Sequence, residues 1–85
     1  MQIPISGYAG NIWVTDTVDT SKIVRIEKGM QQVYPTTPFK RGLVREAIFI
    51  SFRKGPETTY TYDAPNHRDR VYRMLKQQWE QAKNG

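Results

Sequence analysis

Cysteine is absent from this 85-residue sequence, and histidine occurs once. Without cysteine there are no disulfides and no thiolate zinc sites, whereas a small secreted domain usually contains disulfides. Residues 1–10 contain neither a basic segment nor a long apolar run, so we expect no signal peptide. No stretch approaches the roughly 20 apolar residues that span a bilayer. These absences predict a cytoplasmic protein without a membrane segment.

The residue combinations of catalytic and metal sites are missing too. The single histidine, His67, lies just before Arg68 and Arg70, and no spacing pairs it with a nucleophile. The carboxylates are scattered and mostly neighbour lysine or arginine, and no glycine pattern of a phosphate-binding loop is present. We therefore expect a protein that is not an enzyme and that holds no metal and no cofactor.

The length of the chain predicts a single domain over residues 1–85. A chain of this size buries only about 60% of the surface that its unfolded form exposes, so the core must be thin. Ten aromatic residues offset the low aliphatic content, because aromatic rings bury large areas with few rotatable bonds.

The first part of the chain predicts strands separated by irregular segments. Residues 1–10 are rich in glycine and proline and indicate an irregular lead-in. Strand-like runs follow at 11–15 and 22–27. Residues 34–42 contain two prolines, which oppose both a helix and a central strand.

Residues 46–62 give the clearest strand pattern and predict a β-hairpin. Ile48, Ile50 and Phe52 alternate with other residues, so they share one face of a strand. Residues 54–57 form a turn with glycine and proline, and a return strand places Tyr60 and Tyr62 on one face.

Residues 66–83 predict an amphipathic helix with Asn66 as its N-cap. Tyr72, Leu75, Trp79 and Ala82 recur at helical spacing and form one apolar stripe. The expected fold class is α+β: a small antiparallel sheet of four to five strands with this C-terminal helix packed on one face. The other face would be open or curled.

The net charge of +5 arises entirely in the second part of the chain. Residues 1–39 carry three basic and three acidic side chains, whereas residues 40–85 carry ten basic and five acidic ones. Such asymmetry is typical of proteins with an anionic partner, although a charge of this size also serves solubility.

Basic side chains near tyrosines favour single-stranded nucleic acid as that partner, since phosphates pair with charge and bases stack on rings. For each of these residues the alternative is a solvated surface charge or an aromatic ring packed in the core. The candidate nucleic-acid-binding residues are Lys40, Arg41, Arg45, Arg53, Lys54, Tyr60, Tyr62, Arg70, Arg73 and Lys76.

A protein partner is the alternative hypothesis. Trp13 and an uncovered sheet face could form a protein-binding surface, and the edge strands of a short sheet can pair with a second copy. A module of this kind would be a protein-interaction or inhibitory module, such as a phage or mobile-element protein that binds a host protein.

A family resemblance covers residues 48–75. The segments concerned are Ile48-Phe-Ile-Ser-Phe-Arg-Lys-Gly55, Tyr60-Thr-Tyr-Asp-Ala-Pro65 and Val71-Tyr72. They resemble the KTSC domain, in which a strand ends in F-x-x-G, a return strand ends in Y-x-Y and a helix opens with V-Y. The resemblance implies a small α+β module that occurs alone or fused to some lysyl-tRNA synthetases and is suspected of binding nucleic acid. The strand-turn-strand-helix ending is also similar to pleckstrin-like folds, whose last helix often carries a buried tryptophan, as Trp79 would be.

Overall fold

A five-stranded antiparallel sheet and one C-terminal helix make up the computed structural model, which describes residues 1–33 and 43–84. The expected α+β class is confirmed. The elements are, in chain order, β1 (Gln2–Ala9), β2 (Ile12–Asp19), the 3₁₀ helix η1 (Thr20–Lys22), β3 (Ile23–Val33), β4 (Leu43–Phe52), β5 (Thr58–Tyr62) and α1 (Pro65–Asn84).

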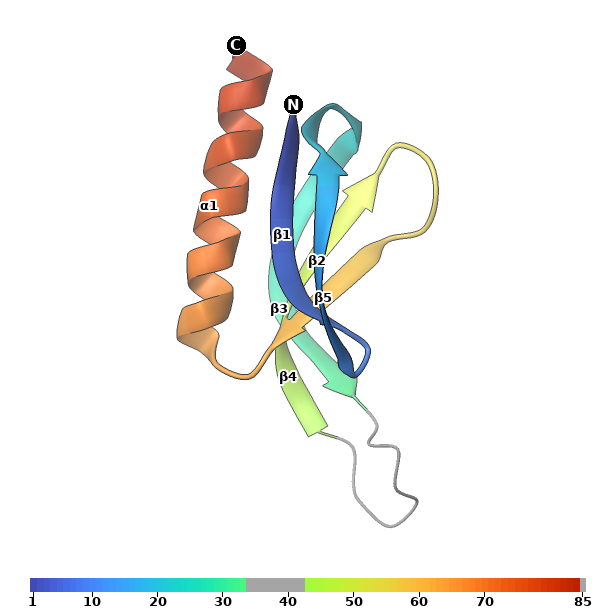
Figure 1. The fold of residues 1–85 in the computed structure, drawn as a ribbon, viewed down its shortest axis with the longest axis vertical. Coiled ribbons are helices and arrows are strands. Elements are labelled where there is room, and N and C mark those ends of the chain that lie inside the picture. Colours follow the sequence, from blue (N-terminus) through green and yellow to red (C-terminus); the bar gives the residue numbers. More distant parts are fainter. Residues whose placement is uncertain (34–42, 85) are drawn as a thin grey trace.

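The sheet consists of two parts that meet between β1 and β5. Its strand order is β2-β1-β5-β4-β3, so β1 and β2 form one hairpin and β3, β4 and β5 form a meander. The two parts pair in register only where Tyr8 lies opposite Thr61. Helix α1 runs along one face of the curled sheet (Figure 1). The described strands β2 and β3 are therefore the two edges of the sheet.

The expected irregular lead-in over residues 1–10 is wrong, because Gln2–Ala9 forms strand β1. Ile3, Ile5 and Gly7 are buried and alternate with more exposed residues, which is the period-2 pattern of a strand. Proline and glycine within the segment hid this pattern. Pro4 lies opposite Thr17 of β2, and no residue of β5 pairs with it.

The expected hairpin and helix are confirmed. Strands β4 and β5 pair from Glu46 with Tyr62 to Ile50 with Thr58. The helix begins one residue before the expected start, at Pro65, and the expected N-cap Asn66 therefore lies in its first turn. Proline suits this position because the first helical N–H has no intrahelical partner.

The core lies between α1 and the sheet. Each strand sends buried side chains to this face, and the helix contributes Leu75 and Trp79. The strand residues of the core are Ile3, Ile5, Val18, Ile23, Ile26, Ile48, Ile50, Tyr60 and Tyr62.

The two tyrosines of β5 point into this core, so the expectation that they offer exposed rings is wrong. Tyr60 is 2% exposed and Tyr62 is 0% exposed, since α1 covers the face on which they lie. The Tyr60 hydroxyl donates to Asp16 of β2 at 2.7 Å, and the Tyr62 hydroxyl donates to the Ser6 carbonyl of β1. Burial raises the pKa of Tyr62 to about 12. Burial and the bond to Asp16 also raise the pKa of Tyr60.

Gly7 gives these tyrosines the space they occupy. A Cβ atom at this position would lie 2.8 Å from the Tyr62 hydroxyl oxygen and 2.9 Å from the Tyr60 Cβ. Both distances are shorter than carbon contacts allow, so any side chain here would push β1 away from β5. The close approach of these two strands therefore depends on glycine.

Arg68 fixes the start of α1 on the sheet. Its Nη1 lies 2.6 Å from the Glu46 carboxylate of β4 and donates to the Gly29 carbonyl of β3 at 2.8 Å. Its Nε donates to Asp69 at 2.8 Å, and this bond is the main reason that the pKa of Asp69 is lowered. The side chains of Arg68 and Glu46 are only 12% and 17% exposed, so this ion pair is shielded from water.

Edge strand β3 carries an irregularity near its start. The register with β4 shifts between Ile23 and Arg25, which leaves Val24 out of the pairing and exposed. A bulge of this kind bends an edge strand and discourages pairing with another chain. A homodimer through a sheet edge stays a prediction, with β2 as the more regular edge. Among the described residues, neither helix combines the length and the apolar character needed to cross a membrane.

Replacing Gly7 with alanine should destabilise the fold by about 1–3 kcal/mol, because an overpacked site must move β1 or the tyrosines. Urea unfolding followed by circular dichroism measures the change. Gly29→Ala is the matched control, since its Cβ would meet only the ring of Phe49, at 3.1 Å. Equal stability of the wild type and the Gly7→Ala variant would contradict the close approach of β1 and β5.

Replacing Arg68 with methionine should lower the free energy of unfolding by about 2 kcal/mol, because the Glu46 carboxylate is left shielded without its cation. The control is Arg70→Met, which removes the same charge from an exposed position on the same helix turn and should change stability by less than about 0.5 kcal/mol. If the two variants lose the same small amount in urea unfolding, Arg68 does not anchor the helix.

Candidate functional site

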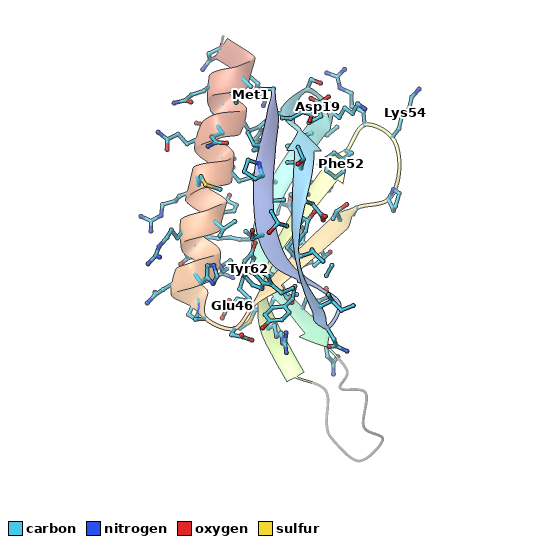
Figure 2. The ribbon with its side chains drawn as sticks, viewed as in Figure 1. Met1, Asp19, Glu46, Phe52, Lys54 and Tyr62 are labelled. Carbon is cyan, nitrogen blue, oxygen red and sulfur yellow. The ribbon has the colours of Figure 1, made fainter. Side chains whose placement is uncertain are left out.

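One end of the molecule brings together four segments that are far apart in the sequence. The N-terminus, the last turn of α1, the η1 connection and the β4–β5 loop all lie at this end (Figure 1). Met1, Asp19, Phe52 and Lys54 are found there, while Glu46 and Tyr62 lie toward the start of the helix (Figure 2). A backbone hydrogen bond of 2.9 Å from the Arg53 N–H to the Lys22 carbonyl joins the β4–β5 loop to η1.

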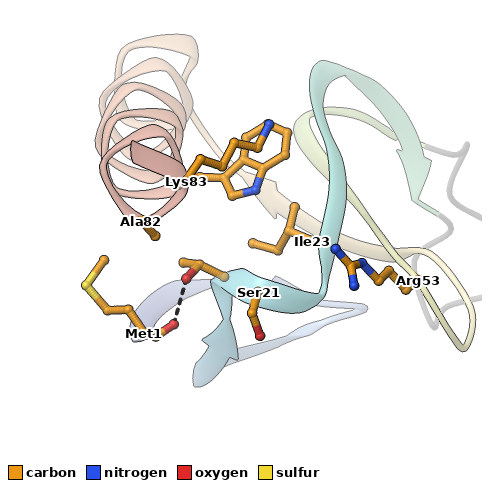
Figure 3. Close-up of a pocket in the computed structure, with 8 residues that line it drawn as sticks. Met1, Ser21, Ile23, Arg53, Ala82 and Lys83 are labelled. Atoms are coloured by element: carbon orange, nitrogen blue, oxygen red, sulfur yellow. Dashed lines mark hydrogen bonds between the residues drawn. The ribbon is translucent and has the colours of Figure 1, made fainter. Parts of the chain in front are cut away.

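Four exposed cations mark this end of the molecule: Lys22, Arg53, Lys54 and Lys83, which we call the basic end. Two cavities open between them. One, of about 240 Å³, is lined by Arg53 and Lys83 among other residues (Figure 3). The other, of about 430 Å³, is lined by Lys22, Arg53 and Lys54. Arg53 therefore borders both cavities and is the residue that connects them.

The charges of the basic end are little neutralised. Within the described part of the chain, none of its four cations forms an ion pair. Asp19 is a carboxylate at this end of the molecule, and it accepts hydrogen bonds from the Ser21 hydroxyl at 2.7 Å and from the Ser21 N–H at 3.0 Å. These bonds lower the pKa of Asp19, so it is ionised at neutral pH. The local balance remains positive, which favours an anionic ligand.

Lysines on aromatic rings extend the basic end along the helix. The Lys83 Nζ lies 3.6 Å from the centre of the Trp79 ring, and the Lys76 Nζ lies 5.3 Å from it. Nearer the start of the helix, the Lys28 Nζ of β3 lies 5.3 Å from the centre of the Tyr72 ring and 3.5 Å from the Asp69 carboxylate, which pairs with its charge. Positions 72, 76, 79 and 83 share one side of a helix, so charge and ring alternate along it.

The structure divides the candidate residues of the sequence among several places. Arg53 and Lys54 lie at the basic end, and Lys76 lies beside it on the Trp79 ring. Arg70 and Arg73 are exposed on the first half of α1, with position 70 about 20 Å from Lys83 along the helix axis.

The remaining candidates do not contribute to the basic end. Arg45 lies at the other end of β4, with its guanidinium 4.8 Å from the centre of the Tyr8 ring and 4.0 Å from Asp63. Tyr60 and Tyr62 are buried and cannot stack on a base. The candidates Lys40 and Arg41 lie outside the described residues.

Sequence reasoning missed Lys22 and Lys83 as members of the site. Lys22 reaches it because β3 pairs with β4, which brings Ile23 opposite Phe52 and Lys22 beside Arg53. If the strand-like run at 22–27 is assumed to pair antiparallel with the first strand of the hairpin, Lys22 is expected near Arg53. Lys83 reaches it because the apolar stripe of α1 sets which way the last turn faces.

A second surface surrounds the turn between β1 and β2. Ile12 is exposed there, and Trp13 is 45% exposed although it contacts three rings. The Trp13 ring centre lies 5.0 Å from Tyr8, 6.2 Å from Tyr62 and 5.7 Å from His67. A tryptophan held rigidly by neighbours, with nearly half of its surface in water, is typical of a protein-binding anchor.

The described residues contain no group of three side chains able to hold a metal ion. Comparison of the chain with protein-family models, with curated proteins and with solved structures gives no match. The resemblance of residues 48–75 to the KTSC domain therefore stays a prediction, and any function has to be argued from the geometry of the two surfaces.

Proposed function

We propose that this protein is a non-enzymatic binding module whose basic end contacts the phosphates of nucleic acid. The observation that carries the proposal is the position of Arg53, which borders two adjoining cavities and has Lys22, Lys54 and Lys83 around it. Exposed cations without carboxylate partners keep their charge available, and phosphate is the anion that offers several such contacts in a row.

The shape of the β4–β5 loop supports this function. Gly55 has a φ angle of 96°, a conformation that other residues rarely adopt, so the loop turns sharply directly after Lys54. Lys54 is thereby held out from the sheet while Arg53 stays bonded to η1 through its backbone. The backbone of Arg53 is held in place and Lys54 projects beside it, which suits two successive phosphates.

Lys83 and Lys76 on α1 favour a single strand over a compact anion. Lys76 continues the positive charge from the basic end along α1, on the Trp79 ring, whereas Lys28 of β3 lies on the Tyr72 ring and pairs with Asp69 at 3.5 Å. A chain of phosphates could follow this line, whereas a single inorganic phosphate would use only the cations around Arg53.

Replacing Arg53 and Lys54 together with glutamine should weaken binding of a labelled single-stranded oligonucleotide. Fluorescence anisotropy titrations between 50 and 200 mM salt give the dependence of log Kd on log salt. Loss of two phosphate contacts should reduce the slope of this dependence by about 1.4, since each contact to a single strand contributes about 0.7. Duplex DNA titrated in parallel tests the preference for single strands.

The matched control is the double variant Arg70→Gln/Arg73→Gln, which has the same net charge but keeps the basic end intact. We expect its salt dependence to stay close to that of the wild type. Equal losses in both double variants would show that only net charge matters. A wild-type protein that fails to bind either oligonucleotide at 50 mM salt would refute the proposal.

A protein-interaction module is the second candidate function, and the Trp13 surface favours it. Ile12 and Trp13 belong to edge strand β2, whose backbone can also pair with an extended segment of a partner. An inhibitory module that binds a host protein would use such a surface, with the basic end serving solubility.

Affinity capture with three bait proteins separates the two functions. Wild-type, Ile12→Asp and Arg53→Gln/Lys54→Gln baits are incubated with nuclease-treated lysate of the source cells. A stoichiometric protein that the Ile12→Asp bait loses and the Arg53→Gln/Lys54→Gln bait retains would support the interaction module. If no protein shows this pattern, the Trp13 surface is not a docking site under these conditions, and the interaction module is rejected.

A further inference from the structure

The smaller cavity of the basic end has an apolar side formed by the helix and by β3. Trp79 and Ala82 of α1 face Ile23, the first residue of β3, across it. Trp79 and Ile23 also belong to the core, so this wall of the cavity is rigid. An apolar wall is unnecessary for holding a phosphate, so the cavity suits a ligand with a flat, apolar part.

The rim of the same cavity is polar and cationic. Arg53, Ser21 and Lys83 are positioned around it, as Figure 3 shows. Because Arg53 also borders the larger cavity, an anionic group bound at Arg53 would leave its neighbouring groups at the entrance of the smaller one. A nucleotide unit has this arrangement, with a charged phosphate joined through a sugar to a flat base.

Trp79 is 7% exposed, and two lysines lie over its ring. The Lys83 Nζ lies 3.6 Å from the ring centre and the Lys76 Nζ lies 5.3 Å from it. The Lys83 side chain is exposed and flexible, so its ammonium group can leave the ring when a base stacks there. A base could therefore replace Lys83 on the ring, and the freed ammonium group would gain a phosphate of the same strand.

We propose that the cavity beside Trp79 receives one base of a single strand whose phosphates lie on Lys22, Arg53 and Lys54. This inference rests on the proposed nucleic-acid function and adds the ligand group that enters the cavity. A volume of about 240 Å³ lies below the roughly 300–1,000 Å³ of sites for drug-sized ligands, so one ring system fits and two do not.

Two ligands of equal length and charge test the inference: an eight-residue oligothymidylate and the same sugar–phosphate strand without bases. The protein carries Trp13→Phe, so that Trp79 is its only tryptophan. We expect the oligothymidylate to quench the Trp79 emission and to bind about tenfold more tightly than the baseless strand. The baseless strand should bind through its phosphates without quenching.

Filling the cavity provides an independent variant. Ala82→Leu, placed in the Trp13→Phe protein, should occupy the space beside Trp79, remove the quenching and reduce the affinity for oligothymidylate to that of the baseless strand. The control Gln81→Leu adds the same side chain at the neighbouring exposed position and should leave both affinities unchanged.

The outcomes distinguish this inference from the proposed function. Equal affinity for the two strands, without quenching of Trp79, would overturn the base site and leave phosphate binding intact. Failure of both strands to bind at 50 mM salt would overturn the proposed function itself, and the base site with it.

Discussion

Two tyrosine hydroxyls of β5 hold the two parts of the sheet together. The β1–β2 hairpin and the β3–β4–β5 meander pair in register at a single position, so backbone hydrogen bonds alone connect them weakly. Tyr62 bonds to the backbone of β1, and Tyr60 reaches past β1 to a carboxylate of β2. The hairpin is therefore positioned by side chains, and the absence of a side chain at Gly7 permits both contacts.

The position of the tyrosines decides where the helix lies and which surfaces remain for function. Because their rings and the isoleucines of β1 and β4 face the same side, α1 must cover that side of the sheet. Arg68 fixes the first turn, and Trp79 packs against the core near the last. The last turn then lies beside η1 and the β4–β5 loop, where lysines and arginines from separate segments meet.

The sequence was sufficient for those parts of the fold in which the pattern is local. The period-2 run around Ile48 and the stripe containing Leu75 and Trp79 predicted a hairpin and a helix, which the structure confirms. Strand β1 was missed because proline and glycine are usually read as turn residues, although alternation of Ile3 and Ile5 was present.

The surfaces were harder to predict than the elements. Alternation shows that Tyr60 and Tyr62 share a face, but it does not show that a helix will cover that face. A helical arginine has the same spacing whether it is exposed, like Arg70, or shielded in an ion pair, like Arg68. The basic end depends on pairing between β3 and β4 across residues 34–42, and no short-range pattern encodes that register.

The neighbouring positions of Met1 and Lys83 beside one cavity have a consequence for protein architecture. A domain whose two ends leave side by side can be inserted into a surface loop of another protein with short linkers, and it can be circularly permuted. A polypeptide joined to either end of this domain would emerge near the cavity that Met1 and Lys83 line, at the basic end of the molecule.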